Sequence, residues 1–375
     1  MVVKTQMAGI RRTGRSTRKR IVLLVNVVGV AVLMAQPAFG EDLWDDPNTW
    51  LLFAEETADP PERESIHDFV FGKENLHGRG LLDFQDGFPL ALLHLQMPLS
   101  TPGLIEEGKT RVEVDFFWSN TTGVESTYTV DAETYELAFG LWRPLRADFY
   151  VGADLSVVSR GSGVLDGPIG DFHDLFGFGD GDTGRISKNS YNIFIVDDVG
   201  RRHELHQGVG LSDLNLKALW VINEGDRWLP AISSQVFTAL PSSTTGFGTD
   251  GLDLGITLTA SKQLFEFFYL HFAVSGTYLT DPTVEGIRFR QVNYAAAVGG
   301  EIVVLRSLSL IVQAMRYSQL LDNTPKLDDP RRYIAAGFKW ALNDVTVFEF
   351  SAIENFETFE NSSDIVFVLG VAFDV

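Results

Sequence analysis

The 375-residue chain contains no cysteine. Disulfides, thiolate metal ligands and cysteine nucleophiles are therefore excluded. After residue 40 the chain also lacks any run of about eighteen apolar residues, the length that a helix needs to cross a bilayer, so we expect no transmembrane helix there. Basic residues are scarce: the chain has 30 Lys and Arg but 50 Asp and Glu, which gives a formal net charge of −20. That charge argues against nucleic acid as a partner.

The first forty residues have the organisation of a secretory signal peptide. Basic residues and no acidic residue precede a mostly apolar run at 21–34, which is followed by Ala38, Phe39 and Gly40. This order predicts a signal peptide that is cleaved before Glu41. The apolar run is too short to span a hydrocarbon core of about 30 Å comfortably, so a retained membrane anchor is the weaker interpretation. The surroundings of the Arg11-Arg12 pair do not fit a twin-arginine signal, and we expect Sec-type export.

Residues 146–157 show the dominant pattern of the mature chain. Odd positions are apolar, as at Phe149 and Leu155, while even positions are polar, aromatic or small, as at Asp148 and Asp154. Most other expected strands show the same alternation, and the links between them are alternately short and long. This combination is typical of an antiparallel, up-and-down transmembrane β-barrel, because an open sheet edge cannot be satisfied in lipid.

The pattern predicts about twelve strands, within a range of ten to fourteen. They are expected at residues 109–120, 133–143, 146–158, 210–222, 228–239, 250–261, 265–279, 287–303, 307–318, 331–342, 344–354 and 363–375. Short turns at 143–145, 223–227, 262–264, 306 and 343 are expected to face the periplasm. Longer links at 121–133, 161–208, 241–249, 281–286, 322–330 and 355–363 are expected to face outward.

The domain organisation follows from these segments. We expect a signal peptide at 1–40, an acidic periplasmic extension at 41–87, and a barrel at 88–375 with a long extracellular loop at 160–208. Residues 90–95 are apolar at both parities and make a poor lipid-facing strand, so they are expected to lie inside the barrel mouth or to plug it. Arg288 and Arg290 break the parity of their strand and are placed above the membrane.

The polar parity of each strand defines the expected lumen. Acidic side chains outnumber basic ones there, and charge on the lipid face would cost roughly 2 to 4 kcal/mol for each Arg or Lys near the midplane. The residues expected to face the lumen are Arg111, Glu113, Asp115, Glu136, Asp148, Asp154, Asp213, Asn215, Lys217, Asp253, His271, Asn293, Glu301, Lys339 and Glu349.

Three segments carry a family resemblance: 133–137, the strand 149–156, and the loop 163–177, which includes a His-Asp-x-Phe-Gly stretch. They resemble a bacterial family catalogued as a domain of unknown function, number 3187, and grouped with outer-membrane barrels. The resemblance covers most of the chain after Phe88 and implies the barrel fold, but it supplies no activity. The last strand is also similar to the C-terminal assembly signal of outer-membrane proteins, although Val375 replaces the usual terminal aromatic residue.

The loop after residue 160 holds the candidates for a constriction. Its apolar positions 165, 169, 172 and 176 have helical spacing, which predicts a short amphipathic helix packed on the inner wall or rim, with gating or substrate contact as the functional alternative. The residues named for that role are Asp166, Phe172, His173, Asp174 and Phe176. The stretch 180–184 has two acids in a Gly-rich loop but lacks the further ligands of an EF-hand, so a solvated loop is favoured over a calcium site.

Three functions remain open at this point. The first is a narrow channel, or a small-solute binding or transport protein, in the outer membrane of a Gram-negative bacterium, favouring cations if its acidic lumen is open. The second is a closed structural or partner-binding barrel. The third is a hydrolase that uses His271 with Ser309 or Ser233. Ser275 shares the inward face of the same strand but lies about 13 Å from His271, which is too far for a hydrogen bond.

No cofactor or metal is expected. The expected partners are outer-membrane lipid, the barrel assembly machinery, periplasmic chaperones and a small solute.

Overall fold

The computed structural model describes residues 78–101, 105–165, 167–168, 187–197, 199–321, 324, 326–356 and 361–375. The expected signal peptide and residues 41–77 of the expected extension lie outside this part of the chain, and both assignments stay predictions. Regular helical structure among the described residues includes one 3-10 turn, η3 (Ala91–Leu93). No described helix is long and apolar enough to cross a membrane.

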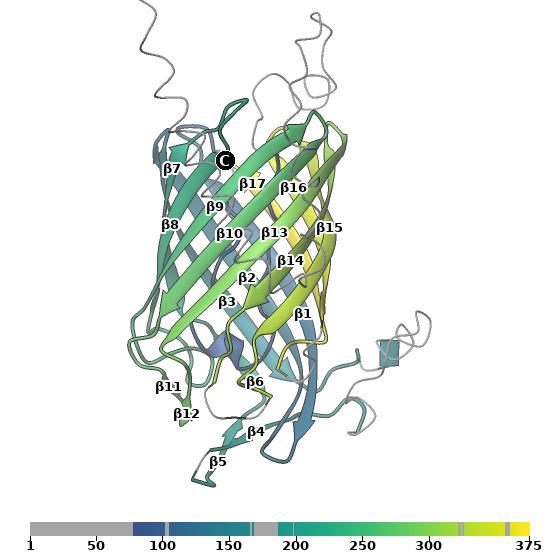
Figure 1. Ribbon diagram of the computed structural model, residues 1–375. Coiled ribbons are helices and arrows are strands. Elements are labelled where there is room, and N and C mark those ends of the chain that lie inside the picture. The colour runs from purple at the N-terminus through teal and green to yellow at the C-terminus, as the bar shows by residue number, and fades with distance from the viewer. Residues whose placement is uncertain are drawn as a thin grey trace, which may run out of the picture. The chain divides into compact units, whose positions relative to one another are not determined.

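Twelve antiparallel strands form a closed barrel, in which β1 pairs with both β2 and β17 and so joins the two ends of the sheet. The predicted up-and-down barrel is confirmed, and Figure 1 shows its tilted strands. The strands are β1 (Arg111–Glu125), β2 (Tyr128–Arg146), β3 (Phe149–Gly161), β7 (Leu214–Asn223), β8 (Ala231–Leu240), β9 (Asp253–Phe265), β10 (Phe268–Tyr278), β13 (Val292–Leu305), β14 (Leu308–Tyr317), β15 (Arg331–Asn343), β16 (Thr346–Asn355) and β17 (Ile365–Asp374).

The two ends of the barrel differ in their connections. Short turns at 147–148, 224–230, 266–267, 306–307 and 344–345 lie at the end where β1 begins and β17 finishes. We call this the periplasmic end and the other the outward end. One expected long link is wrong: residues 121–133 are mostly strand, because β1 and β2 continue outward and meet in a two-residue turn at 126–127.

The described part of the chain has further strands at the outward end, which is the lower end in Figure 1. They are β4 (Asn192–Val196), β5 (Arg202–Leu205), β6 (Gly208–Leu211), β11 (Thr283–Val284) and β12 (Ile287–Arg288). β4 pairs with the outward extension of β2, and β6 pairs with β3. The link after residue 160 is therefore more than a loop, because its described part adds strands to the barrel wall.

The barrel wall has an apolar outer face. Val312 of β14 is 55% exposed, whereas its neighbour Ile311 is 1% exposed, and on β9 Leu258 is 46% exposed beside Thr257 at 1%. Side chains in a strand point alternately to opposite faces, so each strand presents one parity to the surroundings. A continuous apolar exterior of this kind is stable in the hydrocarbon of a bilayer, where a closed barrel also satisfies its backbone hydrogen bonds.

The interior of the barrel is occupied by residues 78–101, which we call the inner segment. Its ascending limb, 78–88, starts near the periplasmic turn at Arg306, whose carbonyl accepts a hydrogen bond from Arg79 (2.9 Å). The chain turns at η3 near the outward end, and its descending limb, 94–101, returns along β9. The boundary expected between residues 87 and 88 is therefore not a structural boundary, since 78–87 lie within the barrel.

Two apolar clusters hold the inner segment. In one, Leu81, Leu82, Leu95 and Met97 pack against inward side chains of the wall, many of which are alanine. These small residues leave room for a second layer of chain, and at Gly299 an added Cβ would lie 2.5 Å from Cδ2 of Leu81. The second cluster closes the outward end, where Phe88, Leu90 and Leu93 pack among residues of β2, β4, β11 and β12.

Candidate functional site

The ascending limb is bound to the wall through charged and polar inward side chains. The backbone N–H of Leu82 donates to Oε1 of Gln313 (2.8 Å), and that of Asp83 donates to Oε1 of Glu349 (2.7 Å). Lys339 Nζ donates to the carbonyl of Leu81 (2.7 Å) and forms an ion pair with Glu349 (3.1 Å). The wall therefore supplies hydrogen-bond partners that this irregular backbone would otherwise lack, and such partners are needed wherever backbone is buried.

Asp86 of the inner segment forms a buried ion pair with the wall. Its Oδ2 accepts a hydrogen bond from Nη1 of Arg331, and its Oδ1 accepts from the hydroxyl of Tyr333 (2.7 Å). The side chains of Asp86 and Arg331 are only 1% and 2% exposed. Arg331 also donates to the carbonyl of Ser318 from Nε (3.4 Å) and Nη2 (3.2 Å). This buried ion pair joins the inner segment to β15 near the outward end.

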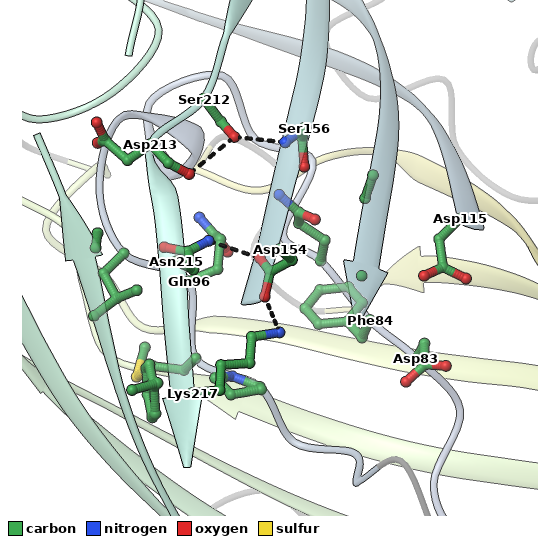
Figure 2. A pocket seen from close by; sticks show the side chains of 18 of the residues that line it. Asp83, Phe84, Gln96, Asp115, Asp154, Ser156, Ser212, Asp213, Asn215 and Lys217 are labelled. Carbon is green, nitrogen blue, oxygen red and sulfur yellow. Dashed lines mark hydrogen bonds and ion pairs between the residues drawn. The ribbon is translucent and has the colours of Figure 1, made fainter. Parts of the chain in front are cut away.

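A cavity of about 160 Å³ remains between the two limbs of the inner segment and the wall made by β1, β2, β3, β7 and β8. Figure 2 shows Asp83 and Asp115 on one side of this cavity and Lys217 with Asp154 on the other. Lys217 forms an ion pair with Asp154, and its ammonium lies 5.7 Å from the ring centre of Trp142. The cavity is thus charged on two sides and aromatic in part.

Most residues expected in the lumen lie on the inner face of the wall. Asn215 donates to Asp154 (2.8 Å), and Asp253 accepts from the backbone of Leu95 (3.3 Å) in the descending limb. The residues that the structure places on inward parity are Arg111, Glu113, Asp115, Glu136, Asp154, Asn215, Lys217, Asp253, His271, Asn293, Glu301, Lys339 and Glu349.

Of the two remaining residues of the expected lumen set, one lies elsewhere and one faces the interior from outside a strand. Asp148 is in the periplasmic turn between β2 and β3, where its half-exposed side chain pairs with Arg146 (3.3 Å), because β2 extends three residues further than expected. Asp213 precedes β7 and faces the cavity, but its carboxylate accepts backbone N–H donors from Ser242, Ser243 and Thr249 at 2.8 to 2.9 Å. Asp213 therefore fixes the outward loop after β8.

The constriction candidates Asp166, Phe172, His173, Asp174 and Phe176 lie outside the described residues. So does the acidic stretch 180–184. Among the residues that the structure does describe, no group of three or more His, Asp or Glu side chains is arranged to hold a metal ion.

Ser261, His271 and Glu301 are arranged like the serine, histidine and acid of a catalytic triad. Ser261 was not among the serines considered from the sequence. Nδ1 of His271 lies 2.8 Å from Oγ of Ser261, and Nε2 lies 2.9 Å from Oε2 of Glu301. The side chain of His271 is 2% exposed and that of Glu301 is fully buried. Oε2 of Glu301 also accepts from the backbone of Arg79 (2.8 Å). These bonds tie the inner segment to the wall, and the buried ring is not presented to a substrate.

Some of the residues that anchor the inner segment were missed at the sequence level. Asp83 and Asp86 lie in a stretch without periodicity, and nothing in the sequence distinguishes them from other acids of the extension. Arg331 gives a partial signal, since it shares the inward parity of Tyr333 and Lys339 in a strand whose other parity is apolar after its first residue. The pairing itself requires the path of the inner segment, which no local pattern encodes.

The outward hairpin β4–β5 carries a polar cluster outside the membrane. Asp197 accepts a hydrogen bond from the backbone of Arg201 (2.8 Å), and its Oδ2 lies 3.0 Å from Nε2 of His203. The hydrogen bond from His203, followed by those from Arg201, holds the pKa of Asp197 well below its usual range. The carboxylate is therefore ionised wherever the hairpin is intact near neutral pH.

The sequence profile of the family described as "Protein of unknown function (DUF3187)" matches residues 73–375. The chain belongs to this family. The match includes the inner segment together with the whole barrel, so both are part of the family's common sequence. No functionally curated protein matches the chain.

Solved structures with the same architecture are outer-membrane barrels. The chain is similar to an outer-membrane channel of Pseudomonas putida F1, with 14% identity, a TM-score of 0.50, and coverage of 73% of this chain and 99% of that chain. It also matches the NanC porin, with 9% identity, a TM-score of 0.42, and coverage of 70% of this chain and 100% of that one. The likeness to the Pseudomonas putida channel shows the fold of an outer-membrane barrel.

Proposed function

We propose that this protein is a small-solute channel of the bacterial outer membrane that is closed in this conformation by its inner segment. The exported chain would reach the membrane through the Sec pathway, periplasmic chaperones and the barrel assembly machinery. Transport requires the inner segment to move or to leave a narrow path beside it. The acidic excess of the inner wall favours cations over anions once water fills the lumen.

The observation that carries this proposal is that the wall beneath the inner segment is charged. Glu301, Lys339, Glu349 and Arg331 all lie under the inner segment, and each is nearly inaccessible to solvent. Buried charges add little stability to a protein interior that is never hydrated, because well-packed apolar residues are often equally stable or more stable there. A wall that alternates between a covered and a hydrated state needs polar side chains. The charged wall therefore supports a lumen that opens.

A closed structural barrel is the second candidate, favoured by the two apolar clusters that pack the inner segment. Leu82, Phe88, Leu90 and Leu93 are fully buried, and fully burying a large apolar side chain stabilises a fold by about 1.5 to 3 kcal/mol. The two functions differ in whether the inner segment ever leaves the wall.

An engineered disulfide between the inner segment and the wall distinguishes them. The chain has no native cysteine, so Leu81→Cys with Gly299→Cys would place the only thiols at the contact where Leu81 meets β13. The matched control is Ser233→Cys with Thr259→Cys, which joins β8 to β9 where the native side-chain oxygens are 2.6 Å apart. Each purified pair would be measured in planar bilayers before and after reduction, in a potassium chloride gradient.

We expect the L81C/G299C barrel to be silent when oxidised and to conduct when reduced, with a reversal potential that indicates cation preference. The S233C/T259C barrel should conduct in both states. Equal conductance of the L81C/G299C barrel in both states would refute a gating role for the inner segment. Absence of conductance in every sample would favour the closed structural barrel.

A further inference from the structure

The cavity beside the inner segment is lined by more carboxylates than cationic groups. Its side chains include Asp83, Glu113, Asp115 and Asp154, and Lys217 is committed to Asp154. Within the described residues, Asp83, Glu113 and Asp115 form no ion pair. Asp83 accepts a hydrogen bond from Ser100, and Glu113 accepts one from the indole of Trp142 (3.1 Å). Negative charge gathered in a partly desolvated space attracts a cation.

Two buried polar groups in the same cavity point independently to a ligand. Gln235 lines the cavity and is 2% exposed, and its Nε2 has no hydrogen-bond partner among the described residues. His94 also lines it at 7% exposure, and its Nε2 is likewise without a partner. Buried polar atoms are nearly always hydrogen-bonded, and leaving one unpaired costs about 1 to 3 kcal/mol. A ligand with an acceptor oxygen would satisfy the amide of Gln235.

The remaining walls define the size and the apolar part of the ligand. Phe84, Phe117, Phe237 and Trp142 contribute aromatic surface to the cavity. Its volume of about 160 Å³ is close to that of an engineered protein cavity of about 150 Å³ that accepts benzene. Aromatic rings also favour organic ammonium groups through their negative faces. The lining therefore fits a compact solute with one ring, one cationic end and one acceptor.

We propose that this cavity binds a small organic ammonium compound that also carries a hydrogen-bond acceptor, with its cation against Asp115, Asp83 and Glu113 and its acceptor toward Gln235. This inference rests on the proposed function, because the cavity would be a binding station for the solute that crosses the barrel. The expected solutes are primary amines with a polar or aromatic body. Binding, rather than conductance, is the measurement that tests for them.

The probes are tyramine, tyrosol and 4-hydroxyphenylacetate, which share a phenol ring and differ at the other end in charge. Each would be titrated by calorimetry into the detergent-solubilised full-length barrel, with micelle blanks subtracted. We expect tyramine to bind at least tenfold more tightly than neutral tyrosol, and the anion to show no binding. An equal affinity for tyrosol and tyramine would overturn the proposal, and so would the absence of binding for all three.

Three variants locate the binding. Asp115→Asn keeps the shape of the side chain and removes its charge, so tyramine affinity should fall about 10- to 100-fold, the range for a hydrogen bond to a charged group. Gln235→Leu should weaken it by about 2- to 10-fold. Asp148→Asn makes the same chemical change in the periplasmic turn and should leave affinity unchanged within twofold. Equal losses in D115N and D148N would overturn the assignment of the site.

The two proposals fail separately. If the reduced L81C/G299C barrel conducts but tyramine does not bind, the channel stands and the ammonium site is refuted. If tyramine binds with the expected variant pattern but no sample conducts, the cavity is a binding site in a barrel that does not transport.

Discussion

Removing Asp86 should release the inner segment from the wall. In Asp86→Ala the guanidinium of Arg331 loses its anion, while both residues are nearly inaccessible in the intact barrel. Breaking a buried ion pair by deleting one partner costs about 3 to 5 kcal/mol, because a charge is left uncompensated. We call the inner segment docked when it lies against the wall. Water reaches Arg331 once the inner segment leaves, so the free-energy cost of the unpaired charge destabilises the docked state alone. The docking equilibrium should shift by roughly 150- to 4,000-fold, since each 1.4 kcal/mol is a factor of ten.

Thiol labelling measures this shift directly. Leu82→Cys would be the only cysteine of the protein, at a position with no exposed surface in the docked state. When docking is fast relative to reaction, the labelling rate with a small methanethiosulfonate reagent follows the undocked fraction. We expect L82C/D86A to label at least a hundredfold faster than L82C, in vesicles, at the same reagent concentration.

A double replacement provides the control. Asp86→Leu with Arg331→Met removes both charges and restores apolar packing, which is often neutral or stabilising relative to a buried pair. Labelling in that background should return to within about tenfold of the L82C rate. The reasoning is refuted if D86A leaves the labelling rate unchanged, or if the double replacement labels as fast as D86A alone.

Further variants test the wall and the outward hairpin. Gly299→Leu should undock the inner segment by steric contact and raise the labelling of L82C, whereas Gly300→Ala on the opposite parity should not; equal labelling would contradict the packing. Val312→Arg, midway along β14 on the lipid face, should lower the free energy of unfolding in vesicles by about 2 to 4 kcal/mol, and Leu342→Arg near the periplasmic rim by about 0 to 1. Below pH about 3.9, the usual pKa of aspartate, the β4–β5 hairpin should become more mobile by spin-label spectroscopy. Because the pKa of Asp197 is depressed, its carboxylate stabilises the hairpin above that pH, and this stabilisation is lost as the pH falls. Asp197→Asn should therefore abolish the pH dependence of the hairpin's mobility.

The barrel could be predicted from the sequence because a strand has a side-chain period of two and lipid accepts only one parity. That rule placed Asp154, Lys217, His271 and Glu349 on the inner face without knowledge of their partners. It failed at Asp148 because β2 continues to Arg146 and Asp148 lies in the turn before β3, where the alternation of the sequence still continues.

Alternation also fails where both faces of a strand are covered by protein. From Ser119 to Thr122 on β1, and from Tyr128 to Thr134 on β2, every residue is buried, so no apolar parity marks the strand. Most of these residues fall within 121–133, which was expected to be a polar outward link. Only residues 90–95 of the inner segment were expected inside the barrel mouth, because they are apolar at both parities. The rest of its path was missed, since its contacts join residues far apart in the sequence, as for Asp86 with Arg331, 245 positions away, and Leu95 with Asp253, 158 positions away.

The inner segment lies within a closed barrel, and the yield of the engineered disulfide in intact outer membranes tests this placement most directly. The L81C/G299C protein should form an intramolecular disulfide in high yield under mild oxidation, seen as a mobility change on a non-reducing gel, at a level similar to S233C/T259C. Efficient cross-linking of S233C/T259C without any in L81C/G299C would show that the inner segment is not seated against β13, and would contradict the account.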